Sequence, residues 1–157
     1  MKCLAGFKCT EEQDLRRAMS LLKPSRSSLF IDIGSGEGEV LLFAASYASC
    51  SCLGLENDKS LVDVSHRAVA SAPEAISSLI SIIEVDAETF DYRETCSHHN
   101  NDVVIYLFLS HFGYAVMGDI LLESCPVNTY IVTVSNPIDH PFWVPRCVWL
   151  GDGDTMS

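Results

Sequence analysis

The feature of this chain that most constrains its fold is a glycine-rich turn between an apolar segment and a helical one. The segment from Leu29 to Ile33 is almost wholly apolar, as expected for a strand that is covered on both faces. Gly34, Gly36 and Gly38 follow it, and the apolar residues of 40–48 predict a helix directly after the turn. Glycine lets the backbone turn sharply, and the start of a helix offers unpaired N–H groups to an anion. We therefore expect a strand, a ligand-binding turn and a helix in succession.

The same alternation of strands and helices is expected along the rest of the chain. Thr10 is the expected N-cap of a first helix, Pro73 the end of a later one, and Pro145 makes 142–150 an edge strand. This order predicts an α/β fold: a doubly wound, mostly parallel sheet with helices on both faces, which binds its ligand at the carboxyl ends of the strands. Further strands are predicted at 51–55, 79–85, 103–109 and 129–134, helices at 10–22, 59–72 and 114–124, and a polar loop at 88–101.

Length and charge limit the domain count and the partners. A chain of 157 residues suits one domain, so 1–157 is expected to form a single minimal domain with its core at about 25–150. Its 10 Lys and Arg against 21 Asp and Glu give a net charge of −11. Nucleic acid and anionic membranes are poor partners for such a chain, because both are bound mainly through Lys and Arg. A basic protein segment would suit it, although the charge could also serve solubility alone, and the oligomeric state stays open.

Neither a membrane span nor a metal site is expected. No apolar run reaches the ~18–20 residues of a membrane span, and 1–7 lacks the features of a signal peptide. We therefore expect a cytoplasmic protein whose seven cysteines are reduced. Cys96, His98 and His99 are faintly metal-like but have no matching second pair, so no metal ligand is predicted.

Two kinds of nucleotide ligand could occupy the glycine turn. The dinucleotide pattern G-x-G-x-x-G requires a third glycine where this chain has Glu39, whose carboxylate would repel a pyrophosphate. The pattern acidic-x-G-x-G-x-G is satisfied at every position from Asp32 to Gly38. S-adenosylmethionine carries one carboxylate, one ammonium and a sulfonium, and is therefore compatible with acidic neighbours. The turn favours S-adenosylmethionine over a nicotinamide cofactor.

Acidic residues also end the next two predicted strands. Glu56 closes the second strand, where a carboxylate can accept hydrogen bonds from both ribose hydroxyls. Asp86 ends the third strand, where a side chain can reach an adenine amino group. Each acid alone is more often a solvated strand end or a helix cap. Acids at the ends of three successive strands favour a shared cofactor site.

This set of motifs resembles the class I (seven-strand) S-adenosylmethionine-dependent methyltransferases over roughly residues 10–150. The resemblance implies a Rossmann-like methyltransferase domain in which Asp32 and the glycine turn hold the methionine part of S-adenosyl-L-methionine. It further implies that Glu56 binds the ribose, that Asn57 flanks the adenine, and that Asp86 and Ala87 cap it. The implied cofactor-binding residues are Asp32, Gly34, Ser35, Gly36, Gly38, Glu56, Asn57, Asp86 and Ala87.

A narrower resemblance concerns the methyl acceptor. The segments 102–109, 120–122, 130–135 and 141–143 resemble a small group that includes the ATP synthase c-subunit lysine methyltransferase, which implies transfer to a protein lysine in a basic segment. Two features depart from that group: the proline that often follows the fourth strand is replaced by Phe108-Leu109-Ser110, and the membrane-anchoring N-terminal segment is missing. A small-metabolite methyltransferase and a non-catalytic, methyltransferase-like binding subunit are the alternatives.

Tyr106 is the candidate catalytic residue. Methylation of an amine depends mostly on alignment with the methyl group and on proton removal. Tyr106 is placed to form a wall of the site, since an aromatic ring or hydroxyl can favour a cationic amine or a sulfonium. An equally good interpretation makes it a core tyrosine. His111 could accept a proton, although a loop histidine without a role fits that position better.

Overall fold

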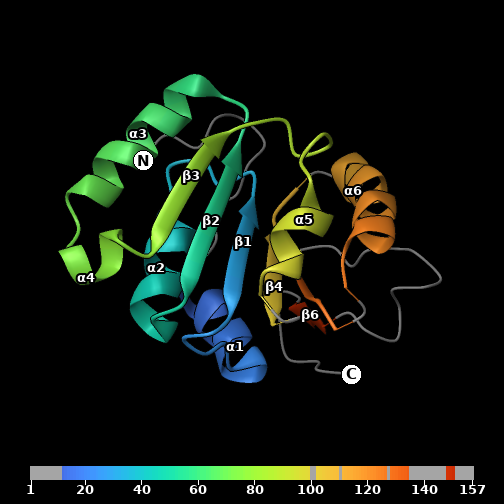
Figure 1. Cartoon of the computed structure of the whole chain (residues 1–157), viewed down its shortest axis with the longest axis horizontal. Helices are drawn as coiled ribbons and strands as arrows, with labels where there is room; N and C mark the ends of the chain where they lie inside the picture. The colour runs from blue at the N-terminus through green and yellow to red at the C-terminus, as the bar shows by residue number, and fades with distance from the viewer. Residues whose placement is uncertain (1–11, 100–101, 110, 127, 135–147, 151–157) are drawn as a thin grey trace.

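The computed structural model describes residues 12–99, 102–109, 111–126, 128–134 and 148–150. Six strands form one sheet in the order β3-β2-β1-β4-β5-β6, and every neighbouring pair is parallel (Figure 1). The prediction of a Rossmann-like, doubly wound parallel sheet is thereby confirmed. The strands are β1 (Leu29–Ile33), β2 (Ser51–Glu56), β3 (Ile80–Glu84), β4 (Val103–Leu107), β5 (Tyr130–Val134) and β6 (Val148–Leu150).

Helices cover both faces of this sheet and create two apolar cores. On one face Leu15, Met19 and Leu41 pack with the strand residues Phe30 and Val104. The opposite core lies under α5 and α6, which stand in front of the sheet in Figure 1. Because β1 and β4 are buried along their whole lengths, both read as continuous apolar runs in the sequence. The helices are α1 (Glu12–Leu22), α2 (Glu39–Ala48), α3 (Lys59–Ala70), α4 (Glu74–Ser77), α5 (Tyr92–Ser97) and α6 (His111–Ser124).

One local prediction was incomplete and another was wrong. Pro73 was expected to end a helix, and α3 does end before it, but Pro73 is also the N-cap of the short helix α4. The expected polar loop 88–101 contains α5, which begins after Asp91, whose side chain accepts a hydrogen bond from the Glu94 N–H at 2.9 Å. Cys96 lies in α5 and is fully buried, so it is not part of an exposed loop. Thr10 and Pro145 lie outside the described residues.

The described residues also bear on membrane and metal binding. Within the described ranges, no helix combines the length and the apolar character that a bilayer span requires. The same ranges hold no group of three or more His, Cys, Asp or Glu side chains arranged around a common point. Cys50, Cys52, Cys96 and Cys125 are free thiols.

Candidate cofactor site

The glycine turn lies at the carboxyl end of β1, where the order of the strands reverses. Gly34, Gly36 and Gly38 have φ angles of 76°, 53° and 86°, a left-handed backbone that other residues rarely adopt. The N–H groups of Gly34 and Ser35 both donate to the Leu55 carbonyl, at 2.8 and 3.1 Å, and the Gly38 N–H donates to the Ser35 carbonyl at 2.9 Å. The three glycines are therefore required by the path of the turn, which is fastened to β2 before α2 begins.

A fourth glycine, Gly54 of β2, creates the space beneath the turn. A Cβ atom on Gly54 would lie 2.6 Å from Cδ1 of Leu41 and 2.7 Å from Oγ of Ser35. Gly54 is also the register partner of Asp32 on β1. The turn thus rests directly on β2, and this contact depends on the absence of a side chain there.

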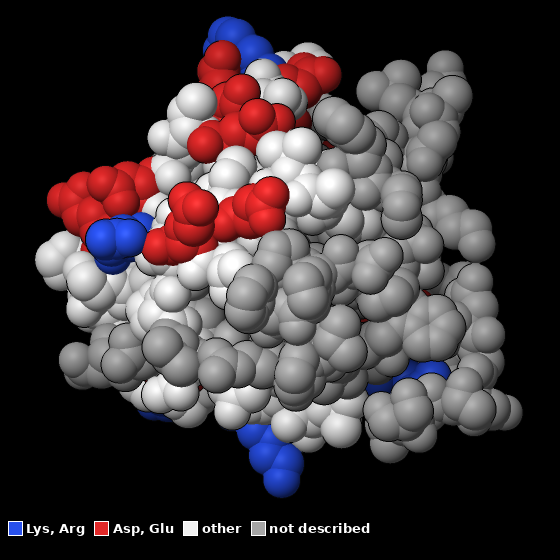
Figure 2. Space-filling model, turned by 90° about the vertical axis from the view of Figure 1, so that its right-hand side faces the viewer, with Lys and Arg blue, Asp and Glu red and all other residues white. Residues whose placement is uncertain are grey.

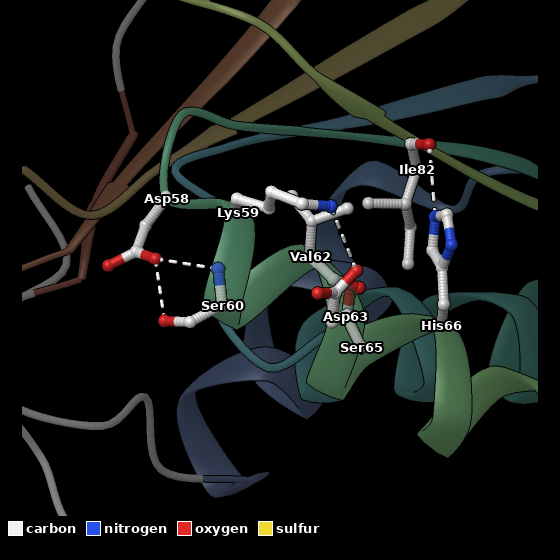
Figure 3. Close-up of polar contacts among 8 residues, drawn as sticks. All are labelled: Asp58, Lys59, Ser60, Val62, Asp63, Ser65, His66 and Ile82. Atoms are coloured by element: carbon white, nitrogen blue, oxygen red, sulfur yellow. Dashed lines mark hydrogen bonds and ion pairs between the residues drawn. The ribbon is translucent and has the colours of Figure 1, made fainter.

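Helix α3, several of whose side chains are drawn in Figure 3, supports the glycine turn from another side. A Cβ atom on Gly38 would lie 3.2 Å from the Ser65 Cβ of α3, so the helix and the turn are close neighbours. The Ser65 hydroxyl donates to the Val62 carbonyl at 2.8 Å. At the start of α3, the Asp58 carboxylate accepts hydrogen bonds from the N–H and the hydroxyl of Ser60 at 2.8 and 2.6 Å. These bonds fix the beginning of α3, which directly follows Glu56 and Asn57.

Glu56 joins the glycine turn to the end of β2. Its side chain is 8% exposed, and its Oε2 atom accepts a hydrogen bond from the Gly36 N–H at 2.9 Å. Its Oε1 atom accepts two more, from the N–H groups of Asn57 and Asp58, both at 2.9 Å. Three N–H donors stabilise the charged form of a carboxylate. Sequence reasoning assigned Glu56 to the ribose and missed these bonds, because they depend on how the turn folds over β2.

Asp32 is a buried carboxyl group beside this carboxylate. It is 3% exposed on β1, between Gly54 of β2 and Tyr106 of β4. Burial, and then the charge of Glu56, raise the pKa of Asp32 from 3.8 to about 8. Among the described residues, no hydrogen bond reaches its carboxyl group. The neutral form of Asp32 is therefore favoured near pH 7.

The remaining predicted cofactor residues lie along the same edge of the sheet. The Val85 N–H donates to the Glu56 carbonyl at 2.9 Å, which places Asp86 next to the end of β2. Asp86 is exposed, and its carboxylate accepts a hydrogen bond from the Glu88 N–H at 2.9 Å. The Ala87 carbonyl accepts one from the Tyr92 hydroxyl of α5 at 2.8 Å. Asn57 is exposed.

Tyr106 lies in the core. Its side chain is 2% exposed, and its ring stacks on Phe30 with centroids 6.1 Å apart and an interplanar angle of 29°. The segment after β4 approaches the glycine turn, since a Cβ atom on Gly34 would lie 3.6 Å from Cδ2 of Leu109. A role for Tyr106 toward the acceptor stays a prediction.

Sequence reasoning missed Tyr114, a buried residue of α6. Its hydroxyl lies 3.1 Å from the Leu107 carbonyl and 2.8 Å from the Val134 carbonyl, at the carboxyl ends of β4 and β5. It therefore holds together the two strand ends on the side of the sheet where the segment after β4 begins. An apolar helix carrying one tyrosine gives no sequence signal for this role.

Comparison with known proteins places the fold. No protein-family model matches the chain, and no curated protein does. An RNA methyltransferase from Salinibacter ruber in complex with S-adenosyl-L-homocysteine superposes with a TM-score of 0.65 at 22% identity, covering 76% of this chain and 72% of that one. The fold is that of the S-adenosylmethionine-dependent methyltransferases.

Two further solved structures have the same fold. A precorrin-6y C5,15-methyltransferase from Geobacter metallireducens has a TM-score of 0.62 at 14% identity, covering 83% of this chain and 65% of that one. A SAM-dependent methyltransferase from Thiobacillus denitrificans, in complex with S-adenosyl-L-homocysteine, has a TM-score of 0.60 at 16% identity, covering 81% and 50%. The chain thus spans about half to three quarters of the lengths of these neighbours, and the first two are named for different substrates, an RNA and a precorrin.

Proposed function

We propose that this protein is a methyltransferase that uses S-adenosyl-L-methionine. The observation that carries the proposal is the turn from Asp32 to Gly38, whose three glycines adopt positive φ angles and whose centre is held by Glu56 of the next strand. Two of the three structural neighbours named above are in complex with S-adenosyl-L-homocysteine. The shared fold, together with the acidic strand ends of this chain, supports a cofactor of this kind here.

The residues present suit this cofactor. Asp32 is a buried carboxyl group without a described hydrogen-bond partner, which suits an ammonium group, and the first turn of α2 suits a carboxylate. Glu56 would bind the ribose, and Asn57 and the pair Asp86–Ala87 would contact the adenine. The bound cofactor supplies the methyl group. The protein's part is to hold it against the segment after β4, with Tyr106 as the proposed catalytic wall residue.

For the acceptor we propose a protein lysine within a basic segment. Figure 2 shows the side of the molecule that lies on the right in Figure 1. Asp and Glu side chains gather on the upper part of the surface that the described residues form there. After β3 and on α5 and α6, the exposed acids include Asp91, Glu94, Asp119 and Glu123. Such a surface attracts a cationic segment and disfavours nucleic acid, although one structural neighbour is an RNA methyltransferase. A cytoplasmic location belongs to the same proposal.

The first test is binding of the cofactor. We expect S-adenosylmethionine and S-adenosylhomocysteine to raise the melting temperature and NADH to leave it unchanged. Glu56→Gln should remove most of this shift, since an amide cannot accept all of the hydrogen bonds that the carboxylate accepts. The matched control is Glu84→Gln, because Glu84 is the exposed register partner of Glu56 on β3. A shift with NADH alone, or an unchanged shift in Glu56→Gln, would contradict the proposal.

A second experiment identifies the acceptor. The protein is incubated with cell extract and cofactor carrying a labelled methyl group, and the labelled products are analysed by mass spectrometry. Labelled lysine in a protein is the expected result. A labelled small molecule would identify a metabolite methyltransferase instead, and cofactor binding without any labelled product would identify a non-catalytic binding subunit.

A further inference from the structure

The two carboxyl groups at the glycine turn have opposite surroundings. Glu56 accepts three backbone N–H donors, which stabilise its negative charge. Asp32 is only 3% exposed, and no described residue donates a hydrogen bond to its carboxyl group. Burial, and then the charge of Glu56, disfavour a negative charge on Asp32. The surroundings of Asp32 therefore favour its neutral form.

No described cation offsets the charge near Asp32. On the flanking strands the titratable side chains are Glu56 and Cys52 of β2 and Tyr106 of β4. The hydrogen bond with Cys50, and then burial, raise the pKa of the Cys52 thiol, so that it stays neutral. The buried face of α1 is apolar, and Glu39 in the first turn of α2 is exposed. The pKa of Asp32, raised to about 8, agrees with this arrangement. Within the described part of the chain, no positive charge lies beside Asp32, and a ligand could supply one.

We propose that Asp32 is neutral in the ligand-free protein and releases its proton when a ligand with an ammonium group enters the site, so that Asp32 selects amine-bearing ligands. The inference rests on the proposed function, because that function supplies the ligand. In this step the O–H bond of Asp32 breaks, the electron pair stays on the carboxylate, and the proton passes to the solvent. The ammonium keeps its protons and pairs with the new carboxylate. Binding of one such ligand therefore releases about one proton below the pKa of Asp32.

Calorimetry measures this proton directly. S-adenosylhomocysteine is titrated into the whole protein at pH 6.5 in phosphate and in imidazole, two buffers with different ionisation enthalpies. The ligand amine is already largely protonated at this pH, since free α-amino groups have pKa values of about 7.7–8.0. We expect about one proton released per ligand, and an affinity that rises by up to about tenfold between pH 6 and pH 7. 5′-Methylthioadenosine, which has no amino acid part, should bind without releasing a proton.

Two variants assign the proton to Asp32. Asp32→Asn should bind S-adenosylhomocysteine without proton release and with an affinity that stays constant from pH 6 to pH 7. Glu74→Gln removes an exposed carboxylate from α4, which precedes the amino end of β3, and should behave like the wild type. Because the comparison of the two ligands uses the wild-type protein, the test stands even if Asp32→Asn does not fold.

Three outcomes would overturn the inference. S-adenosylhomocysteine binding to the wild type without proton release would remove it and leave the proposed function intact. Equal proton release with 5′-methylthioadenosine, or in a folded Asp32→Asn variant, would show that another group supplies the proton. If neither S-adenosylmethionine nor S-adenosylhomocysteine binds the folded wild type, the proposed function fails first and the inference falls with it.

Discussion

At the scale of single residues, Asp32 ties the stability of the fold to pH. Its pKa is about 8 in the folded protein and 3.8 in a solvated chain, so the folded state holds the proton more tightly. The stabilisation of the folded state by this tighter proton binding is complete below pH 4 and is lost as the pH rises toward 8. Asp32→Asn cannot titrate, so its free energy of unfolding should gain on that of the wild type by up to about 1.4 kcal/mol per pH unit in this window.

Urea denaturation at pH 5, 6.5 and 8 measures this difference. Glu39→Gln serves as the control and should run parallel to the wild type, since Glu39 is exposed. If the free energies of unfolding of Asp32→Asn and the wild type differ by the same amount at all three pH values, Asp32 does not titrate between pH 5 and pH 8.

The same scale shows what can be predicted of the site from sequence. The residues of the site could be predicted because a glycine turn and acidic strand ends are local patterns. Their hydrogen bonds and pKa values could not be predicted, because these depend on contacts between residues distant in sequence. Gly36 and Glu56 meet across 20 positions, and the charge of Glu56 then acts on Asp32. Such coupling arises only once β1 and β2 are paired.

At the scale of elements, the contact between the glycine turn and β2 depends on Gly54. Gly54→Ala would place a methyl group within 2.7 Å of both Leu41 and Ser35, so either α2 or the turn must shift. Overpacking of this kind costs typically about 1–3 kcal/mol of stability. We expect a loss of that size in chemical denaturation, together with a smaller thermal shift by S-adenosylhomocysteine. Ser51→Ala, a less buried position at the start of the same strand, is the control and should change neither quantity.

Tyr114 makes the corresponding link between α6 and the ends of β4 and β5. Tyr114→Phe keeps the ring and removes the hydroxyl that lies near the Leu107 and Val134 carbonyls. The free energy of unfolding should fall by about 0.5–1.5 kcal/mol, the usual contribution of a hydrogen bond. Tyr130→Phe, on an exposed tyrosine of β5, provides the comparison in the same denaturation experiment and should have no effect. Equal stabilities of the two variants would show that the Tyr114 hydroxyl contributes nothing.

Elements with a long apolar face were predicted well, and short ones were not. The predicted bounds of β1 match the structure. All five of its residues are buried, and all are apolar except Asp32, which lies at the site. Helices α4 and α5 have only four and six residues, too few to show a helical period. Helix α5 is stabilised by its Asp91 cap and by the bond from the Tyr92 hydroxyl to the Ala87 carbonyl.

At the scale of the whole molecule, charge works against the compact state. The chain has a net charge of −11, and the two ion pairs of the described residues, Arg16–Glu12 at 2.7 Å and Lys59–Asp63 at 3.6 Å, are both exposed. Exposed pairs contribute little, so most of the repulsion among the acidic side chains is left to the solvent and its ions.

Salt should therefore stabilise this protein. Raising KCl from 20 to 300 mM shortens the screening length to below about 10 Å, which weakens repulsion between acids on different elements. We expect a gain of about 1 kcal/mol, or ~2–4 °C in melting temperature for a chain of this size. The gain should shrink near pH 4.6, where the net charge of the sequence vanishes. A melting temperature that falls with KCl at pH 7.5 would show that attractive pairs outweigh the repulsion, and that the acidic surface is not under electrostatic strain that a cationic segment could relieve.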